Sequence, residues 1–123
     1  METARTRRPL ELSSGYQLRS FTYVGDVAEG MLRLGLTRAG DVVNLSSGRL
    51  TSVRRFVEVA AGELGIEPNL LCFGVLPASE WDMQITAVST ESVQRLLAWL
   101  PPTSIEQGIR NTAAAACAPV LCR

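Results

Sequence analysis

The clearest pattern of apolar and polar positions lies in the middle of the chain. Five apolar residues there follow the i, i+3, i+4, i+7, i+11 spacing of a single helical face: Val53, Phe56, Val57, Ala60 and Leu64. Thr51 or Ser52 can cap the first turn of this helix through a side-chain oxygen. Gly65 is suited to the C′ position, where a left-handed backbone is common. The spacing therefore predicts an amphipathic helix between these two signals.

A second helical face is formed by Val27, Met31 and Leu34. Asp26 precedes this face. Glu29 follows Asp26 by three residues, which is the spacing of a capping box. We therefore expect Asp26 to cap its own helix.

Two shorter helices are predicted in the last third of the chain. The first begins near Thr90, carries Val93, and ends before Pro101, because proline cannot continue a helix. Thr103 and Glu106 form another capping box, and the helix that follows has one apolar face: Ile105, Ile109, Thr112 and Ala113.

Four short apolar or β-branched runs read as strands: Leu10–Leu12, Phe21–Val24, Val42–Leu45 and Leu70–Phe73. Together with about four helices, they predict an α/β class, as an α+β-like fragment. Sheets of two or three such strands are only marginally stable alone, so the pattern indicates part of a larger sheet.

Length and composition fit one globular domain. The chain has 123 residues, of which 46% are hydrophobic and 20% charged. We expect a frayed start at residues 1–8, a folded lobe at 9–113 and a tail at 114–123.

Charge excludes several kinds of function. Twelve basic residues balance twelve acidic ones, so the net charge favours neither nucleic acid nor an anionic membrane. All the basic residues are arginines, and the chain has no lysine and no histidine. Serine–histidine and cysteine–histidine dyads, histidine metal sites and Schiff-base lysines are thereby excluded.

The cysteines are Cys72, Cys117 and Cys122. An odd count without a CxxC pair predicts free thiols and a cytoplasmic location, with no disulfide framework and no metal site. The sequence also contains no apolar run of the roughly 20 residues that would cross a bilayer, and no secretory signal pattern.

Five segments carry a resemblance to a known family. Residues 12–27, LSSGYQLRSFTYVGDV, are similar to L-x-x-G-x-Q-x-R-D-F-x-Y-V-x-D-V, and residues 43–48, VNLSSG, to N-x-G-S-G. Thr51 to Val53 open a helix as the family's next segment does, residues 98–101 resemble L-G-W-x-P, and residues 103–112, TSIEQGIRNT, resemble T-S-L-E-E-G-L-R-x-T. On these motifs the chain resembles the C-terminal, substrate-binding part of an extended short-chain dehydrogenase/reductase, in the NAD-dependent epimerase/dehydratase family that acts on nucleotide sugars.

The resemblance implies a lobe without the family's reactive half. The family binds NAD or NADP at a Gly-rich turn, G-x-x-G-x-x-G, and reacts through Y-x-x-x-K; neither occurs in this chain. We therefore expect no cofactor site and no catalytic residue in this chain, and weak or no catalysis from it alone.

One substrate-binding residue is implied. Arg19 matches the family arginine that contacts the nucleotide diphosphate, and its charged fork suits phosphate oxygens. Ser20 stands where the family usually has aspartate, which can orient such groups more strongly. Related enzymes carry a second phosphate-binding arginine after a proline, near residues 76–83, whereas this chain has no arginine between Arg55 and Arg95.

Three interpretations remain open at this point. The chain is a nucleotide-sugar-binding lobe derived from an epimerase or dehydratase, an assembly module that completes a separately encoded Rossmann domain, or a repurposed self-associating binding protein. The nucleotide, the sugar and the parent reaction (epimerase, dehydratase or reductase) are not distinguished by these motifs.

Overall fold

The computed structural model describes residues 8–37, 41–78 and 85–117. The elements follow in the order β1 (Leu10–Leu12), β2 (Leu18–Arg19), α2 (Val24–Thr37), β3 (Thr51–Ser52), α3 (Val53–Glu63), the 3₁₀ helix η1 (Pro68–Leu70), β4 (Leu71–Phe73), α4 (Glu91–Leu97) and α5 (Ile105–Cys117). The α/β class with four α-helices and short strands is therefore confirmed.

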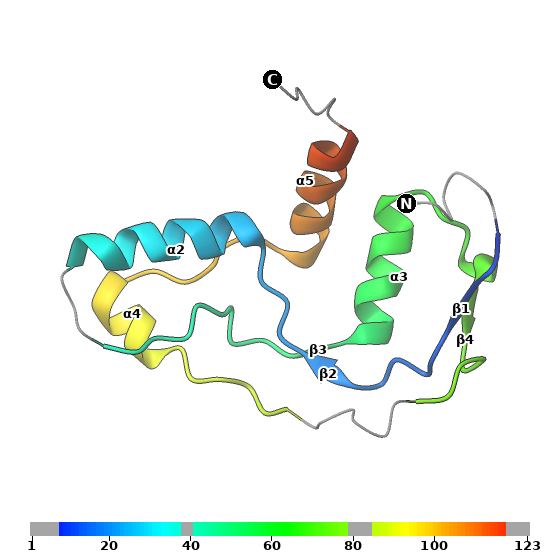
Figure 1. Ribbon diagram of the computed structural model, residues 1–123, viewed down its shortest axis with the longest axis horizontal. Coiled ribbons are helices and arrows are strands. Elements are labelled where there is room, and N and C mark those ends of the chain that lie inside the picture. Colours follow the sequence, from blue (N-terminus) through cyan, green and yellow to red (C-terminus); the bar gives the residue numbers. More distant parts are fainter. Residues whose placement is uncertain (1–7, 38–40, 79–84, 118–123) are drawn as a thin grey trace.

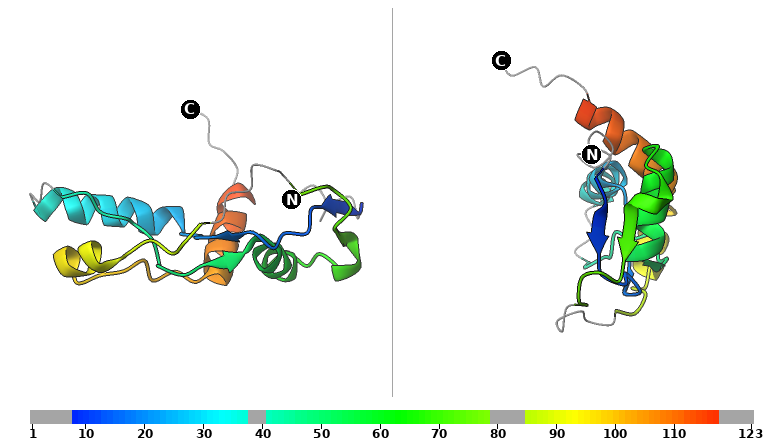
Figure 2. Two further views of the ribbon diagram at one scale, coloured as in Figure 1. Left: turned by 90° about the horizontal axis from the view of Figure 1, so that it is seen from below. Right: turned by 90° about the vertical axis from the view of Figure 1, so that its right-hand side faces the viewer.

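The molecule is elongated, with different elements at its two ends (Figures 1 and 2). Helices α2 and α4 lie together at one end, and the pair β1 and β4 lies at the other. Helices α3 and α5 lie side by side between them, and the short ribbon of β2 and β3 joins the two ends. Within the part of the chain that is described, no helix is long and apolar enough to cross a membrane.

Two separate two-stranded sheets hold segments that are distant in sequence. Strand β1 pairs in parallel with β4, with Leu10 opposite Leu71 and Leu12 opposite Phe73. Strand β2 pairs antiparallel with β3, with Leu18 opposite Ser52 and Arg19 opposite Thr51. The predicted strand Leu10–Leu12 is confirmed, and the predicted strand Leu70–Phe73 begins one residue later.

Helix α3 is capped at both ends as its sequence predicts. The hydroxyl of Ser52 accepts a hydrogen bond from the Arg55 N–H at 3.1 Å. At the other end Gly65 has a φ of +65°, and the Ile66 N–H donates to the Ala61 carbonyl at 2.8 Å. This is the Schellman arrangement, which satisfies the last carbonyls of a helix.

Two predicted strands are wrong. At Phe21–Val24 the chain forms no ladder, because Phe21 stacks on Phe56 with ring centroids 4.0 Å apart and α2 already begins at Val24. At Val42–Leu45 no neighbouring strand is present among the described residues to pair with. The side chain of Val42 is consequently 95% exposed, whereas a buried strand was expected.

Helix α2 is fixed along its inner side. The predicted self-cap by Asp26 is wrong, because its carboxylate accepts from the Thr103 N–H at 2.9 Å and the Thr103 hydroxyl at 2.7 Å. Glu29 accepts from the Nε of Arg33 at 3.0 Å instead of completing a capping box. Gly30 is buried against Leu45 and Trp99, where a Cβ atom would lie within 3.0 Å of both side chains.

The caps of the last two helices differ by one residue from the prediction. Helix α4 begins after Thr90, but the side-chain acceptor for the Glu91 N–H is Ser89, at 3.3 Å. Helix α5 is capped by Ser104, whose hydroxyl accepts from the Gln107 N–H at 3.2 Å, because Thr103 is used by Asp26. Helix α5 continues past residue 113 to Cys117.

Candidate functional site

The ribbon of β2 and β3 positions the predicted substrate-binding residue. Arg19 lies in β2 directly opposite Thr51, and opposed residues of an antiparallel pair project to the same face. The Arg19 guanidinium donates through Nη1 to the Leu18 carbonyl at 2.7 Å. Arg19 is therefore on the same side of the ribbon as Thr51, with its side chain half-buried.

A cleft of about 450 Å³ with one polar and one apolar wall is lined by Thr51 on this side of the ribbon, whereas Arg19 is not among its lining residues. Its polar wall includes Thr51 and Arg49 of the chain leading into β3, Ser47 before them, and Ser104 and Glu106 at the start of α5. A cleft of this size is within the range that small ligands occupy in proteins. Two segments distant in sequence thus form one polar site beside Arg19.

Arg49 is a cleft residue that the sequence reasoning missed. It is exposed, and in the described part of the chain its side chain makes no ion pair or hydrogen bond. Its sequence signal is that it precedes Thr51 by two residues, because residues two apart in an extended segment project to the same side. That signal becomes informative only once Thr51 is known to lie opposite Arg19.

Ser20 is hydrogen-bonded to the neighbouring turn. Its hydroxyl lies 2.7 Å from the hydroxyl of Ser46, which is buried and accepts from the Gly48 N–H at 3.1 Å. Gly48 has a φ of +72°, which favours glycine. Ser20 therefore stabilises the turn before β3 through its hydrogen bond to Ser46, and this turn leads into the ribbon.

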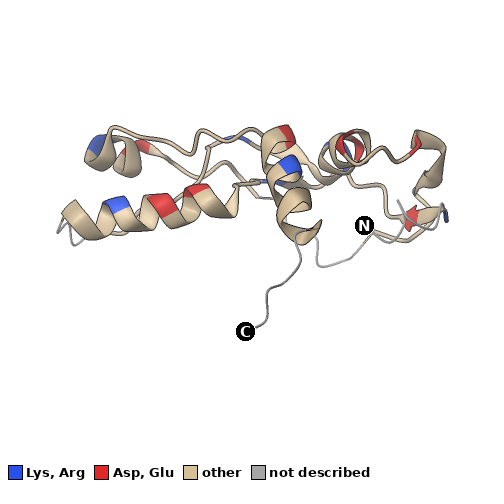
Figure 3. Ribbon diagram, turned by 90° about the horizontal axis from the view of Figure 1, so that it is seen from above, with Lys and Arg blue, Asp and Glu red and all other residues tan. Residues whose placement is uncertain are grey.

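Glu106 keeps a negative charge on the α5 side of the cleft. Its own backbone N–H and the hydroxyl of Ser104 hold the pKa of the Glu106 carboxyl below its ordinary value, with smaller contributions from Arg55 and Arg110. Figure 3 shows acidic and basic residues interspersed along the molecule. Among the residues that line the cleft, the cationic side chain is Arg49 at the ribbon and the anionic one is Glu106 at α5.

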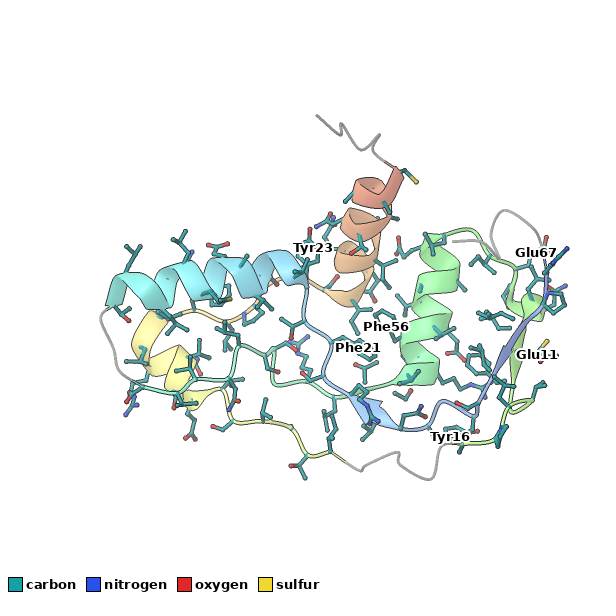
Figure 4. The ribbon with its side chains drawn as sticks, in the orientation of Figure 1. Glu11, Tyr16, Phe21, Tyr23, Phe56 and Glu67 are labelled. Carbon is teal, nitrogen blue, oxygen red and sulfur yellow. The ribbon has the colours of Figure 1, made fainter. Side chains whose placement is uncertain are left out.

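A second cleft, almost wholly apolar, lies between α3 and α5. Its volume is about 550 Å³, and its walls include the stacked rings of Phe21 and Phe56, together with Leu64, Ile105 and Ile109. Figure 4 shows Phe21 and Phe56 directed toward each other between the ribbon and α3. Phe21 lines both clefts and separates the apolar one from the polar one.

A nicotinamide dinucleotide is commonly bound at a Gly-rich turn between a strand and a helix N-terminus. No such turn is present among the described residues. Here β3 passes directly into α3, with the Ser52 hydroxyl on the first turn, and the left-handed glycines lie elsewhere: Gly15, Gly48, Gly65 and Gly74. Among the same residues no group of three or more potential metal ligands is present.

Comparisons with known proteins agree with the resemblance. No protein-family model matches the chain. The chain is 26% identical over 107 residues to a putative UDP-glucose 4-epimerase of Methanocaldococcus jannaschii, covering 87% of this chain and 33% of that protein. It is 29% identical over 98 residues to a GDP-mannose 3,5-epimerase of Oryza sativa, covering 80% of this chain and 25% of the relative.

The fold is similar to that of solved epimerases. An epimerase of Methanothermobacter thermautotrophicus superimposes with a TM-score of 0.76 at 25% identity, over 92% of this chain and 34% of the other. The chain thus spans about a third of the length of the relatives that it matches.

Proposed function

Because this chain is related to the extended short-chain dehydrogenases that act as nucleotide-sugar epimerases and dehydratases, we propose that it is a nucleotide-sugar-binding lobe in which Arg19 holds the diphosphate. One observation carries the proposal. Arg19, the residue that matches the family's phosphate-binding position, lies on a strand beside a polar cleft of about 450 Å³. The proposal includes a cytoplasmic location, which the free thiols Cys72 and Cys117 support.

Arginine suits this role chemically. Its guanidinium is always charged and presents N–H groups that can bind two phosphate oxygens at once. Strand β2 limits the motion of the backbone beneath the side chain, so less freedom is lost on binding. The half-buried position also strengthens the charge–charge attraction relative to a fully solvated arginine.

The lobe is proposed to bind without reacting. The chain contains no lysine and no histidine, and no proton-transfer pair corresponding to Y-x-x-x-K can form from its own residues. The redox chemistry of the related enzymes requires a nicotinamide cofactor, and none of the described strand–helix junctions carries a Gly-rich turn, which supports this part of the proposal. Isothermal titration with NAD and NADP is expected to give no heat of binding, and a micromolar affinity would contradict this part of the proposal.

A panel of UDP-, GDP-, CDP- and dTDP-sugars tests the binding function. We expect one of them to raise the melting temperature of the 123-residue chain. Arg19→Gln should abolish the shift, whereas Arg8→Gln, an exposed arginine beside β1, should leave it unchanged. If no member of the panel shifts the transition, the lobe does not bind nucleotide sugars and the proposal is wrong.

A second function, as an assembly module, is favoured by the outer side of α2. Four large apolar side chains are exposed there, with exposed fractions between 63% and 78%: Val24, Met31, Leu32 and Leu36. The adjacent extended segment bearing Val42 has no strand partner in the described structure. An apolar helix face beside a segment without a strand partner resembles one layer of an α/β unit, and a Rossmann-type sheet would complete it.

Co-purification tests this second function. The partner would be the product of a neighbouring reading frame that encodes the Gly-rich turn and Y-x-x-x-K. Light scattering after size exclusion should show a one-to-one complex that Leu32→Glu disrupts and that Gln94→Glu, an exposed change on α4, does not. Association of the chain with itself in the same measurement would favour the repurposed, self-associating protein instead.

A further inference from the structure

We propose that Arg49 is a second phosphate-binding residue, so that the polar cleft holds a nucleoside diphosphate between Arg19 and Arg49. This inference rests on the proposed function and adds to it, because nothing in the family resemblance points to position 49. It identifies the cleft itself as the binding site and the diphosphate as the part of the ligand that the cleft recognises.

Arg19 and Arg49 both lie near Thr51, one across the ribbon from it and the other before it in the chain. Arg19 is paired with Thr51, and Arg49 precedes Thr51 by two residues. Arg49 precedes the ladder, which pairs only residues 18–19 with 51–52, but it lines the cleft together with Thr51. Two long arginine side chains on either side of Thr51 can converge on adjacent phosphates.

The side chains around Arg49 complete the donor set. The Thr51 hydroxyl makes no hydrogen bond in the described part of the chain, and Thr51 also lines the cleft. The Ser47 hydroxyl accepts from the Arg49 N–H at 3.4 Å, and its own proton remains available to a ligand. Two hydroxyl donors therefore line the cleft with the Arg49 guanidinium, a combination suited to phosphate oxygens.

The charge distribution fixes where the anion binds. Glu106 lies on the opposite wall, and a glutamate carboxyl is ionised at neutral pH. This carboxylate repels phosphate from the start of α5. The diphosphate is therefore directed to the ribbon side, toward Arg49 and Thr51.

Arg49 also replaces a second phosphate-binding arginine, which the resemblance leads us to expect near residues 76–83. The related enzymes carry their second phosphate-binding arginine after a proline near residues 76–83, and this chain has none between Arg55 and Arg95. A single arginine leaves one phosphate of the pair without a charged partner. An arginine supplied from the turn before β3 restores the second partner by a different route.

Calorimetric titration of the 123-residue chain with UDP, GDP, CDP and dTDP, and with the matching monophosphates, tests the inference. For the diphosphate that binds, Arg49→Gln should weaken the affinity about 10- to 100-fold, as expected for loss of a charge-assisted contact. The monophosphate should be affected less, since Arg19 alone can hold it. Arg49→Lys should recover part of the loss, and Arg8→Gln should have no effect.

The outcomes separate this inference from the function that it rests on. If Arg19→Gln loses binding and Arg49→Gln binds as tightly as the unaltered chain, the role of Arg49 is refuted and the binding lobe stands. If no nucleoside diphosphate binds the unaltered chain, both are refuted. The melting temperature of the Arg49→Gln protein should equal that of the unaltered chain, because the exposed side chain has no partner to lose.

Discussion

Helices α2 and α3 are both amphipathic, but they are held in the molecule in opposite ways. Helix α3 packs against α5, η1 and β3, and none of its large apolar residues is exposed. Helix α2 is fixed at two points, Asp26 and Gly30, and presents a second apolar side to solvent. The difference shows that α3 is stabilised by contacts within the chain, whereas the outer side of α2 is available to another surface.

The largest expected difference comes from truncating one apolar side chain on each helix. Phe56→Ala on α3 removes the ring that stacks on Phe21 and should destabilise the chain by about 2–3 kcal/mol. Leu32→Ala on α2 removes a side chain that is 67% exposed and should change stability by about 0.5 kcal/mol or less. Urea denaturation measures both. Equal losses would show that the outer side of α2 is buried in solution.

Removing the polar attachment of α2 should have the next largest effect. Asp26→Ala deprives the Thr103 N–H and hydroxyl of their acceptor, and we expect a loss of about 2 kcal/mol. Glu29→Ala, one turn along the same helix, loses only an exposed ion pair with Arg33 and should cost about 0.3 kcal/mol. Similar melting temperatures for the two variants would mean that Asp26 does not hold the start of α5.

Alanine substitutions of two glycines, Gly30 on the inner side of α2 and Gly35 on its outer side, test the difference between the two sides. Gly30→Ala places a Cβ 2.7 Å from a Leu45 methyl carbon and should destabilise by about 1 kcal/mol after its gain in helix propensity. Gly35→Ala meets nothing within 4 Å and should stabilise by about 1 kcal/mol. Thermal denaturation of the two variants should therefore shift in opposite directions, and shifts of the same sign would refute the assigned inner side.

The smallest expected effect is a pH dependence at α5. Since folding lowers the pKa of Glu106, its contribution to stability is present above the unfolded value of 4.5 and is lost as the pH falls through the lower folded value. The melting-temperature difference between the unaltered chain and Glu106→Gln should therefore shrink as the pH is lowered from 7 to 3. A difference that stays constant over this range would contradict the hydrogen bonds that lower the pKa of the Glu106 carboxyl.

The sequence predicted α3 well because its pattern and its packing agree. Its apolar spacing, the cap at Ser52 and the left-handed Gly65 are local features that the fold retains. The strand prediction at Val42–Leu45 failed for a nonlocal reason, because a β-branched run becomes a strand only beside another strand. The role of Asp26 was also missed, since Thr103, its partner, is distant in the sequence.

The candidate site likewise contains one residue that local sequence predicts and one that depends on contacts between distant segments. Arg19 was found from a motif, and its role in binding stays a prediction. Arg49 was not found, because its relevance depends on the pairing of β2 with β3 and on the closeness of α5 to that ribbon. Side chains that several distant segments bring together leave no signal in the local pattern of a single chain.

The parallel pairing of β1 with β4 has a consequence for the rate at which the molecule folds. The whole of α2 and α3 lies between these two strands in the sequence, so their contact closes a long loop. Loop-closure entropy opposes such a contact until the intervening helices have formed, and distant pairings slow folding in general. We therefore expect the pair to form late, so that weakening it would speed unfolding far more than it slows refolding.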